Sequence, residues 1–186
     1  MLERLIHSLE TAPVMKRGEY NYFIHPITDG VPLLEPGLLR EIGCAMVRCL
    51  DLLRVDKIVV CEAMGIHIGV VLSLMTDIPL VVVRKRPYCL PGEVAVHQTT
   101  GYSKGELYLN GVGAGDRVVI VDDVCSTGGT LRALIGAIEH TGAEIADICV
   151  VIGRGDEDVG RPLKTLVRVE VSETQVRVVD TCLRPY

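Results

Sequence analysis

The amino-acid sequence predicts one α/β domain, spanning residues 1–186, with a central parallel sheet flanked by helices. Short runs of β-branched and apolar residues recur four times, and helical stretches separate the first pair and the last pair. Continuous apolar runs are typical of strands buried on both faces, and the order strand, helix, strand indicates parallel pairing. With 186 residues, of which 48% are hydrophobic, the chain supplies enough apolar surface for one core.

The N-terminal segment, about residues 1–36, contains four prolines, which interrupt regular structure. The C-terminal segment after Gly153 is rich in glycine and charge before it ends in the β-like runs VRVEV and QVRVVD. We expect residues 1–36, with the C-terminal segment as a further contributor, to form a small lobe on the sheet.

The core elements are predicted in the following order. Apolar residues at three- and four-residue spacing after the Pro36-Gly37 break predict an amphipathic helix from Leu38 to Leu53. The elements expected after it are the strand Lys57–Cys61, the helix Ile66–Met75, the strand Pro79–Val83, the strand Val118–Val121, the helix Leu131–His140 and the strand Ile148–Ile152.

Two further strands, Val94–His97 and Leu107–Leu109, are expected between the second and third core strands. A polar, glycine-containing loop joins them. We interpret this loop as a candidate lid over a binding site.

The composition excludes several classes of protein. A formal net charge of −5 argues against a surface that grips nucleic acid, because such binding needs many Lys and Arg side chains to neutralise phosphates. No apolar run reaches the roughly 20 residues of a membrane helix, and the opening MLERLIHSLE is unlike a signal peptide, so we expect a cytoplasmic protein.

Seven scattered cysteines without a CxxC pair predict reduced, mostly buried thiols, with Cys44 and Cys49 packing one helix.

Chemically active residue types gather where the predicted strands end. Loops that follow parallel strands meet at one edge of the sheet, and open α/β sheets bind ligands there. Three of the predicted strands are followed by Glu62–Gly65, Arg84–Arg86 and Asp122–Thr130. One edge therefore combines cations, carboxylates and a glycine–hydroxyl loop.

The chemistry of these loops suits a ribose phosphate. A Ser/Thr/Gly turn that opens a helix, here Ser126–Thr130, points backbone N–H groups at one position where a phosphate binds. Asp122 and Asp123 suit vicinal ribose hydroxyls as hydrogen-bond acceptors. Arg84–Arg86 and Lys104 of the lid suit a second anion, such as pyrophosphate. The alternatives are a ligand-free helix cap at Ser126–Thr130, and solvated side chains at Arg84–Arg86 and Lys104.

The segment VVIVDDVCSTGGTL (Val118–Leu131) resembles the 5-phosphoribosyl-1-pyrophosphate (PRPP) signature of type I phosphoribosyltransferases. This resemblance implies the fold of that family, a central parallel sheet with a small hood lobe. It also implies that the residues contacting substrate are Glu62, Ala63, Met64 and Gly65 of a pyrophosphate loop, Arg84 and Lys85 of a second pyrophosphate contact, Tyr102 and Lys104 of a flexible catalytic loop (Gln98–Glu106), Asp122 and Asp123 at the ribose, and Val124, Cys125, Ser126, Thr127, Gly128, Gly129 and Thr130 around the 5-phosphate. The catalytic roles implied fall to Asp122, Asp123, Arg84, Lys85 and Lys104.

Two longer segments, GEYNYFIHPITDGVP and RKRPYCLPGEVAVHQTTGYSKGELYLNG, extend the likeness to archaeal hypoxanthine/guanine phosphoribosyltransferases, which are built like the adenine enzymes. The implied activity is purine salvage, in which PRPP and hypoxanthine or guanine give IMP or GMP and pyrophosphate. Gly101 stands where adenine enzymes carry Glu, and Ser126 stands where the usual hypoxanthine enzymes carry Asp. Neither residue that handles the proton of the base is present, so adenine remains the rival base. In the hood, Tyr22 and Phe23 would either stack on the base or pack the core.

The resemblance also implies a cofactor and a partner. Mg²⁺ would enter on the oxygens of PRPP, with no ligand set supplied by the chain itself, and the chain would form a homodimer. Two readings compete with a purine salvage enzyme. One is a PRPP-sensing regulator that binds nucleic acid, and the other is a relative that binds PRPP but has lost catalysis.

Overall fold

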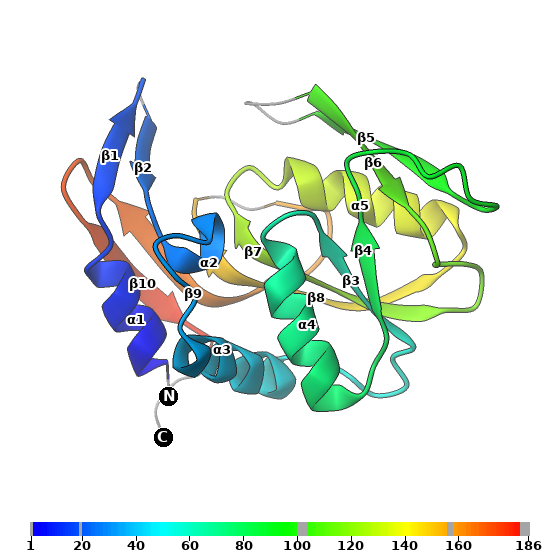
Figure 1. Cartoon of the computed structure of the whole chain (residues 1–186), viewed down its shortest axis with the longest axis horizontal. Coiled ribbons are helices and arrows are strands. Elements are labelled where there is room, and N and C mark those ends of the chain that lie inside the picture. The colour runs from blue at the N-terminus through cyan, green and yellow to red at the C-terminus, as the bar shows by residue number, and fades with distance from the viewer. Residues whose placement is uncertain (1, 19, 100–103, 156–157, 183–186) are drawn as a thin grey trace.

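A twisted six-stranded sheet runs through the centre of the computed structural model (Figure 1). Its strands are β3 (Lys57–Cys61), β4 (Leu80–Val83), β7 (Arg117–Cys125), β8 (Glu144–Gly153), β9 (Lys164–Val171) and β10 (Val176–Thr181). They lie in the order β10-β9-β8-β7-β3-β4, and all neighbours pair in parallel except β9 and β10. The structure describes residues 2–18, 20–99, 104–155 and 158–182.

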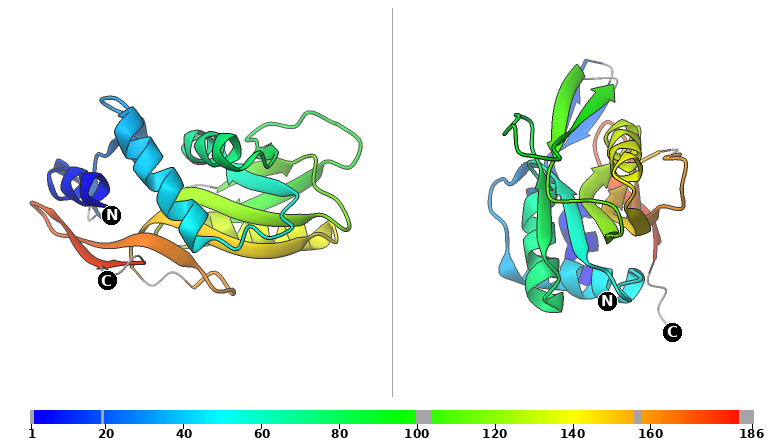
Figure 2. Two further views of the ribbon diagram at one scale, coloured as in Figure 1. Left: turned by 90° about the horizontal axis from the view of Figure 1, so that it is seen from below. Right: turned by 90° about the vertical axis from the view of Figure 1, so that its right-hand side faces the viewer.

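Helices cover both faces of this sheet (Figure 2). One face carries α1 (Glu3–Glu10), α3 (Pro36–Cys49) and α4 (Gly65–Thr76), and the opposite face carries α5 (Gly129–His140). Alternate residues of β7 serve the two cores, since Val119 and Val121 belong to the first cluster while Val118 and Ile120 belong to the second. Burial on both faces is the reason that the central strands β3, β7 and β8 contain continuous apolar runs.

Two antiparallel hairpins stand beyond the carboxyl ends of the parallel strands, at the top of Figure 1. The first is β1 (Val14–Arg17) with β2 (Tyr20–Phe23), followed by the short helix α2 (Pro26–Asp29), and the second is β5 (Val94–Thr99) with β6 (Lys104–Leu109). Arg84 and Tyr108 exchange backbone hydrogen bonds of 3.1 and 2.7 Å, which tie the second hairpin to the end of β4. The two hairpins therefore flank one edge of the sheet.

The core elements predicted from the sequence are confirmed, but α3 ends at Cys49 rather than at Leu53. The backbone of Leu50 is extended, and the Asp51 carboxylate accepts a hydrogen bond of 3.1 Å from the Leu53 N–H. This local turn replaces the next helical turn, because an Asp side chain competes with carbonyl groups for backbone donors. Leu53 is consequently 73% exposed.

β7 is longer than predicted, and this corrects the placement of the two aspartates in a loop. The strand continues to Cys125, because Asp122 pairs with Val150 and Cys125 pairs with Gly153 of β8. The C-terminal strands β9 and β10 likewise continue the central sheet instead of building an accessory lobe.

The cysteines also differ from the prediction. Cys61, Cys125 and Cys149 are buried, whereas Cys44 is exposed on α3, so the prediction that Cys44 packs that helix is wrong. Among the helices that the structure describes, none is long and apolar enough to cross a membrane.

Candidate functional site

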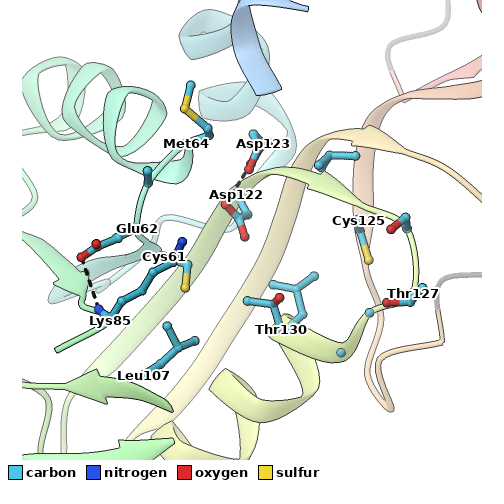
Figure 3. A pocket seen from close by; sticks show the side chains of 16 residues that line it. Cys61, Glu62, Met64, Lys85, Leu107, Asp122, Asp123, Cys125, Thr127 and Thr130 are labelled. Carbon is cyan, nitrogen blue, oxygen red and sulfur yellow. Dashed lines mark hydrogen bonds between the residues drawn. The ribbon is translucent and has the colours of Figure 1, made fainter. Parts of the chain in front are cut away.

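A cavity of about 350 Å³ opens where β3 and β7 end and α5 begins (Figure 3). It contains most of the residues that the sequence singled out, and adds Cys61, Leu107 and Leu131, which it did not. The lining residues are Cys61, Glu62, Ala63, Met64, Lys85, Leu107, Asp122, Asp123, Val124, Cys125, Ser126, Thr127, Gly128, Gly129, Thr130 and Leu131.

The two aspartates are the buried acids of the cavity, at 8% and 9% exposure. The Asp123 N–H donates a 3.0 Å hydrogen bond to Oδ1 of Asp122. Burial raises the pKa of Asp122 to about 6, and burial together with the charge of Asp122 raises the pKa of Asp123. In a ligand-free pocket the pair therefore holds protons more tightly than ordinary aspartates, and a bound cation would help both to ionise.

The loop Ser126–Gly128 and the first turn of α5 form a cradle beside these acids. Gly128 is the N-cap of α5, with φ +71°, and makes no side-chain cap. Arg132 fixes the loop from outside, since its Nη2 donates to the Thr127 carbonyl at 2.7 Å and its Nη1 donates to the Asp158 carbonyl. The first backbone N–H groups of a helix lack intrahelical partners, so this end of α5 suits an anion.

The loop after β3 forms the opposite wall. Its Glu62 carboxylate accepts a hydrogen bond from Nε of Arg84 and a 3.3 Å hydrogen bond from the Lys85 N–H. The Arg84 guanidinium thus lies on Glu62 and is not among the lining groups, whereas Lys85 lines the cavity. Figure 3 shows the Lys85 side chain running past Cys61. Gly65, which begins α4, is not a lining residue, but a Cβ there would lie 2.8 Å from Oδ1 of Asp122.

The structure does not test the roles predicted for Tyr102 and Lys104. Tyr102 lies outside the described residues. Lys104 begins β6, and its side chain lies outside the described part of the structure. Their roles stay predictions.

A second cavity, of about 420 Å³, lies under the hairpin β1–β2. It shares Asp123, Val124 and Ser126 with the first cavity, so the two join at the end of β7. The other residues that line it are Arg17, Tyr20, Tyr22, Phe23, Thr28 and Arg154.

Tyr22 and Phe23 both line this second cavity, but they are held differently. The Tyr22 hydroxyl donates to Asp29, and burial followed by this hydrogen bond raises its pKa to about 12. Phe23 is 5% exposed and belongs to the core cluster, so packing accounts for most of its surface. Tyr22 is half-buried and so leaves more of its side chain open to the cavity than Phe23 does.

The two arginines of the second cavity were missed by sequence reasoning. The Arg17 guanidinium lies 4.1 Å from the centroid of Tyr22, and that of Arg154 lies 4.0 Å from the centroid of Tyr20. Arg154 also donates to the Asn21 carbonyl at 2.7 Å. A signal for Arg154 was present, because it stands two residues after the predicted strand Ile148–Ile152, at the same edge of the sheet.

Comparison with known proteins agrees with this architecture. The family profile described as "Phosphoribosyl transferase domain" matches residues 35–185. The chain is 69% identical over 180 residues to the hypoxanthine/guanine phosphoribosyltransferase of Methanosphaerula palustris, covering 97% of this chain and 98% of the relative. It is 61% identical over 183 residues to the protein of that name from Methanocella arvoryzae, covering 96% and 95%.

A solved structure supports the same fold. The adenine phosphoribosyltransferase of Thermoanaerobacter pseudethanolicus matches with a TM-score of 0.72 at 24% identity, over 90% of this chain and 99% of that one. The family profile covers most of the chain, and the relatives align over nearly their whole length. The chain therefore belongs to the phosphoribosyl transferase domain family.

Proposed function

We propose that this chain transfers the 5-phosphoribosyl group of PRPP to hypoxanthine or guanine, giving IMP or GMP and pyrophosphate. The observation that carries the proposal is a cavity in which a glycine–hydroxyl cradle adjoins two buried carboxylates. Relatives up to 69% identical that are named hypoxanthine/guanine phosphoribosyltransferase support the choice of bases. A purine nitrogen would form a bond to C1 of the ribose as the bond to pyrophosphate breaks.

In this proposal the cradle at the start of α5 holds the 5-phosphate. The backbone N–H groups of the first turn and the hydroxyls of Ser126, Thr127 and Thr130 are donors of the kind that phosphate oxygens accept. Asp122 and Asp123, a few residues earlier, then accept hydrogen bonds from the ribose hydroxyls. Positive charge that develops on the ribose is stabilised by these two acids once they are ionised.

The wall formed by residues 62–64 and Lys85 is proposed to hold the pyrophosphate. Lys85 supplies the positive charge that stabilises the leaving group. Arg84 has a different part, because its guanidinium is engaged with Glu62 and so orients that loop. Lys104, the first residue of β6, would add a second cation.

Mg²⁺ is proposed to arrive with PRPP. Among the described residues no three His, Cys, Asp or Glu side chains converge as a metal-binding group. The Asp122 and Asp123 carboxylates are nevertheless hard oxygen donors of the type that Mg²⁺ takes. When bound, the ion would neutralise charge on the departing pyrophosphate.

The purine base is proposed to occupy the cavity under the hairpin β1–β2. Arg17 and Arg154 bring guanidinium groups, which only donate hydrogen bonds. Hypoxanthine and guanine present the acceptors O6 and N7 on one edge, and a guanidinium matches that pair. Adenine presents an amino donor at the same position, which would leave donors facing donors. This pair of arginines, which we call the cationic hood, thus favours 6-oxopurines over adenine.

A purine panel tests the proposal. The chain is incubated with PRPP, Mg²⁺ and hypoxanthine, guanine or adenine, and nucleoside monophosphates are separated and quantified. We expect kcat/KM for hypoxanthine and for guanine to exceed that for adenine by at least about 10-fold. A base whose polar edge does not match the buried donors of the site loses at least that factor in kcat/KM. Preferential formation of AMP would instead support an adenine enzyme.

A matched pair of variants assigns the specificity to the hood. Arg17→Met should lower kcat/KM for hypoxanthine by about 10-fold or more, by removing a charged donor, and should narrow the difference from adenine. Lys16→Met, at the exposed neighbouring position that pairs with Glu173, serves as the control and should leave the ratio unchanged. An unchanged ratio in both variants would remove Arg17 from base recognition.

The two competing readings predict other outcomes of the panel. A relative that has lost catalysis would bind PRPP yet form no nucleotide with any base. A regulator would bind nucleic acid in a tight, salt-sensitive manner, which a gel-shift experiment detects. The net charge of −5 argues against the regulator, because binding of nucleic acid requires a positively charged surface.

We further propose a cytoplasmic homodimer that buries the outer side of α4. This helix exposes Val70, Leu74 and Met75, with Leu74 at 79% exposure. Exposed apolar side chains grouped on one helix are typical of an interaction surface. Light scattering should give twice the chain mass for the wild type and the single chain mass for Leu74→Lys.

A further inference from the structure

Two cysteines that lie far apart in the sequence meet at the end of α3. Cys49 is the last residue of that helix, and Cys182 follows β10. Their Sγ atoms lie 2.9 Å apart across a sequence separation of 133 residues. The sulfur atoms of a disulfide are about 2.05 Å apart, so an approach of less than about 1 Å separates this pair from bonding distance.

Strand β9 holds the backbone of both cysteines. The Cys49 carbonyl accepts a 2.7 Å hydrogen bond from Nζ of Lys164, and the Cys182 N–H donates a 3.0 Å hydrogen bond to the Leu166 carbonyl. Lys164 and Leu166 both belong to β9, and α3 packs on the same strand. Figure 2 shows the end of α3 lying against the C-terminal strands. The contact between the sulfurs is therefore positioned from both sides by one element of the sheet.

Cys49, Cys182 and the nearby Cys149 differ in burial and in the pKa of their thiols. Burial, followed by the hydrogen bond with Cys49, raises the pKa of Cys182 to about 12, so Cys182 keeps its proton near neutral pH. Burial raises the pKa of Cys149 well above its usual range, with the charges of Cys49 and Cys182 as lesser causes. Cys149 is fully buried, whereas Cys49 is half-buried and Cys182 is exposed. A reagent in solution can thus reach the pair but not Cys149.

We propose that Cys49 and Cys182 form a reversible disulfide that fastens the end of β10 to α3, by exchange with a low-molecular-weight disulfide. The Cys49 thiolate attacks one sulfur of that reagent, and the first small thiol departs as its thiolate. Cys182 then loses its proton and attacks Cys49 Sγ in the mixed disulfide, which releases the second small thiol. The two cysteines together lose two electrons and two protons, and the reagent gains them as two thiols.

The bond would stabilise the fold because it would close most of the chain into one loop. Cross-links across long loops remove the most conformational freedom from the unfolded chain. For a chain of this size we expect the thermal midpoint to rise by about 5–15 °C on oxidation and to return on reduction with dithiothreitol.

Peptide mapping of the oxidised protein tests the proposal directly. The reduced, folded chain is incubated with oxidised glutathione without denaturant, remaining thiols are alkylated, and the digest is analysed by mass spectrometry. The expected result is one cross-linked peptide pair that joins Cys49 to Cys182 within a chain of single-chain mass, with two equivalents of reduced glutathione released. Separate glutathione adducts on Cys49 and Cys182, or a cross-link to Cys149 instead, would overturn the proposal.

Two serine variants supply the control. Cys44→Ser removes an exposed thiol from the same helix and should still form the link and show the rise in thermal midpoint. Cys49→Ser should lose both while keeping the thermal midpoint of the reduced wild type. A rise of the same size in Cys49→Ser would show that the stabilisation has another origin and would contradict the proposal.

Discussion

The properties of the site concentrate in Asp122 and Asp123, two neighbouring acids buried at the end of β7. Burying carboxylates side by side is unfavourable, because each loses hydration and repels the other. Both effects raise the pKa of Asp123, and burial raises the pKa of Asp122. A fold retains such a pair most readily where a ligand compensates it, and a ribose with an accompanying cation would do so.

Removing these charges should abolish most of the activity. Replacing both residues with Asn keeps their shape and the hydrogen bond between them, but removes the negative charge that stabilises the ribose as it becomes positive. We expect kcat for IMP formation to fall by about 100- to 1000-fold, measured at saturating PRPP. The control is Asp77→Asn, at the exposed C-cap of α4, which should be silent. Near-normal turnover in the double variant would refute the assignment.

The same pair predicts a pH dependence of stability in the ligand-free protein. A carboxyl group with a raised pKa binds its proton more tightly in the folded state than in the unfolded state, so its contribution is fully present below about pH 4. That contribution is lost as the pH rises through about 6, the pKa of Asp122. In urea unfolding from pH 4 to pH 8, the wild type should therefore lose stability relative to the double Asn variant. A constant difference between the two proteins would contradict the shifted pKa.

Some residues of the site could be predicted from the sequence and others could not. Asp122, Asp123 and Ser126–Thr130 form one continuous segment with a recognisable chemistry, so they could be named in advance. Arg17 and Arg154 come from opposite ends of the chain and meet only through the tertiary fold. Arg17 carries no local signal of such a meeting, and the position of Arg154 just after a predicted strand does not reveal that the two lie in one cavity.

At the scale of elements, α4 depends on close contact with the sheet. A Cβ on Gly69 would lie 2.5 Å from Cγ1 of Val60 in β3 and 2.7 Å from Cδ1 of Leu80 in β4. The absence of a side chain at Gly69 allows this helix to approach both strands. Since α4 begins at the loop Glu62–Gly65, its distance from the sheet also sets the position of one wall of the cavity.

Two glycines in helices should respond oppositely to alanine. Gly69→Ala should lower the free energy of unfolding by about 1–3 kcal/mol, because the added methyl group overpacks a filled space. Gly136→Ala, exposed on α5 with no atom within 4 Å of the added Cβ, should raise it by about 0.5–1 kcal/mol through the higher helix propensity of alanine. Urea denaturation measures both, and a stabilising Gly69→Ala would contradict the close packing.

Element types were predictable from the sequence, but several ends were not. The cores of β3, β7 and β8 are apolar runs buried on two faces, and the edge strand β4 is equally apolar, so all four were recognisable. The end of β7 was misjudged because Asp122 and Asp123 look like loop residues, although the ladder with β8 continues through them. The end of α3 depends on one hydrogen bond from the Leu53 N–H to Asp51, which periodicity does not reveal.

At the scale of the whole molecule, the sheet brings distant segments to a single edge. β3 and β7 lie side by side, so the loop Glu62–Gly65 faces the cradle Ser126–Thr130 across one cavity. The two hairpins flank that edge (Figure 1). The order of strands is set by long-range pairing, and for this reason the sequence predicted the shared edge but misplaced the C-terminal strands.

The proposed function requires that the edge of the sheet formed by Asp122–Thr130 binds a ribose phosphate. Isothermal titration calorimetry with PRPP and Mg²⁺ tests it most directly. We expect saturable binding of one PRPP per chain. Ribose 5-phosphate should displace it competitively, because it carries the ribose hydroxyls assigned to the aspartates and the phosphate assigned to the cradle. An absence of binding heat together with an unchanged thermal midpoint, or binding of PRPP that ribose 5-phosphate does not displace, would contradict it.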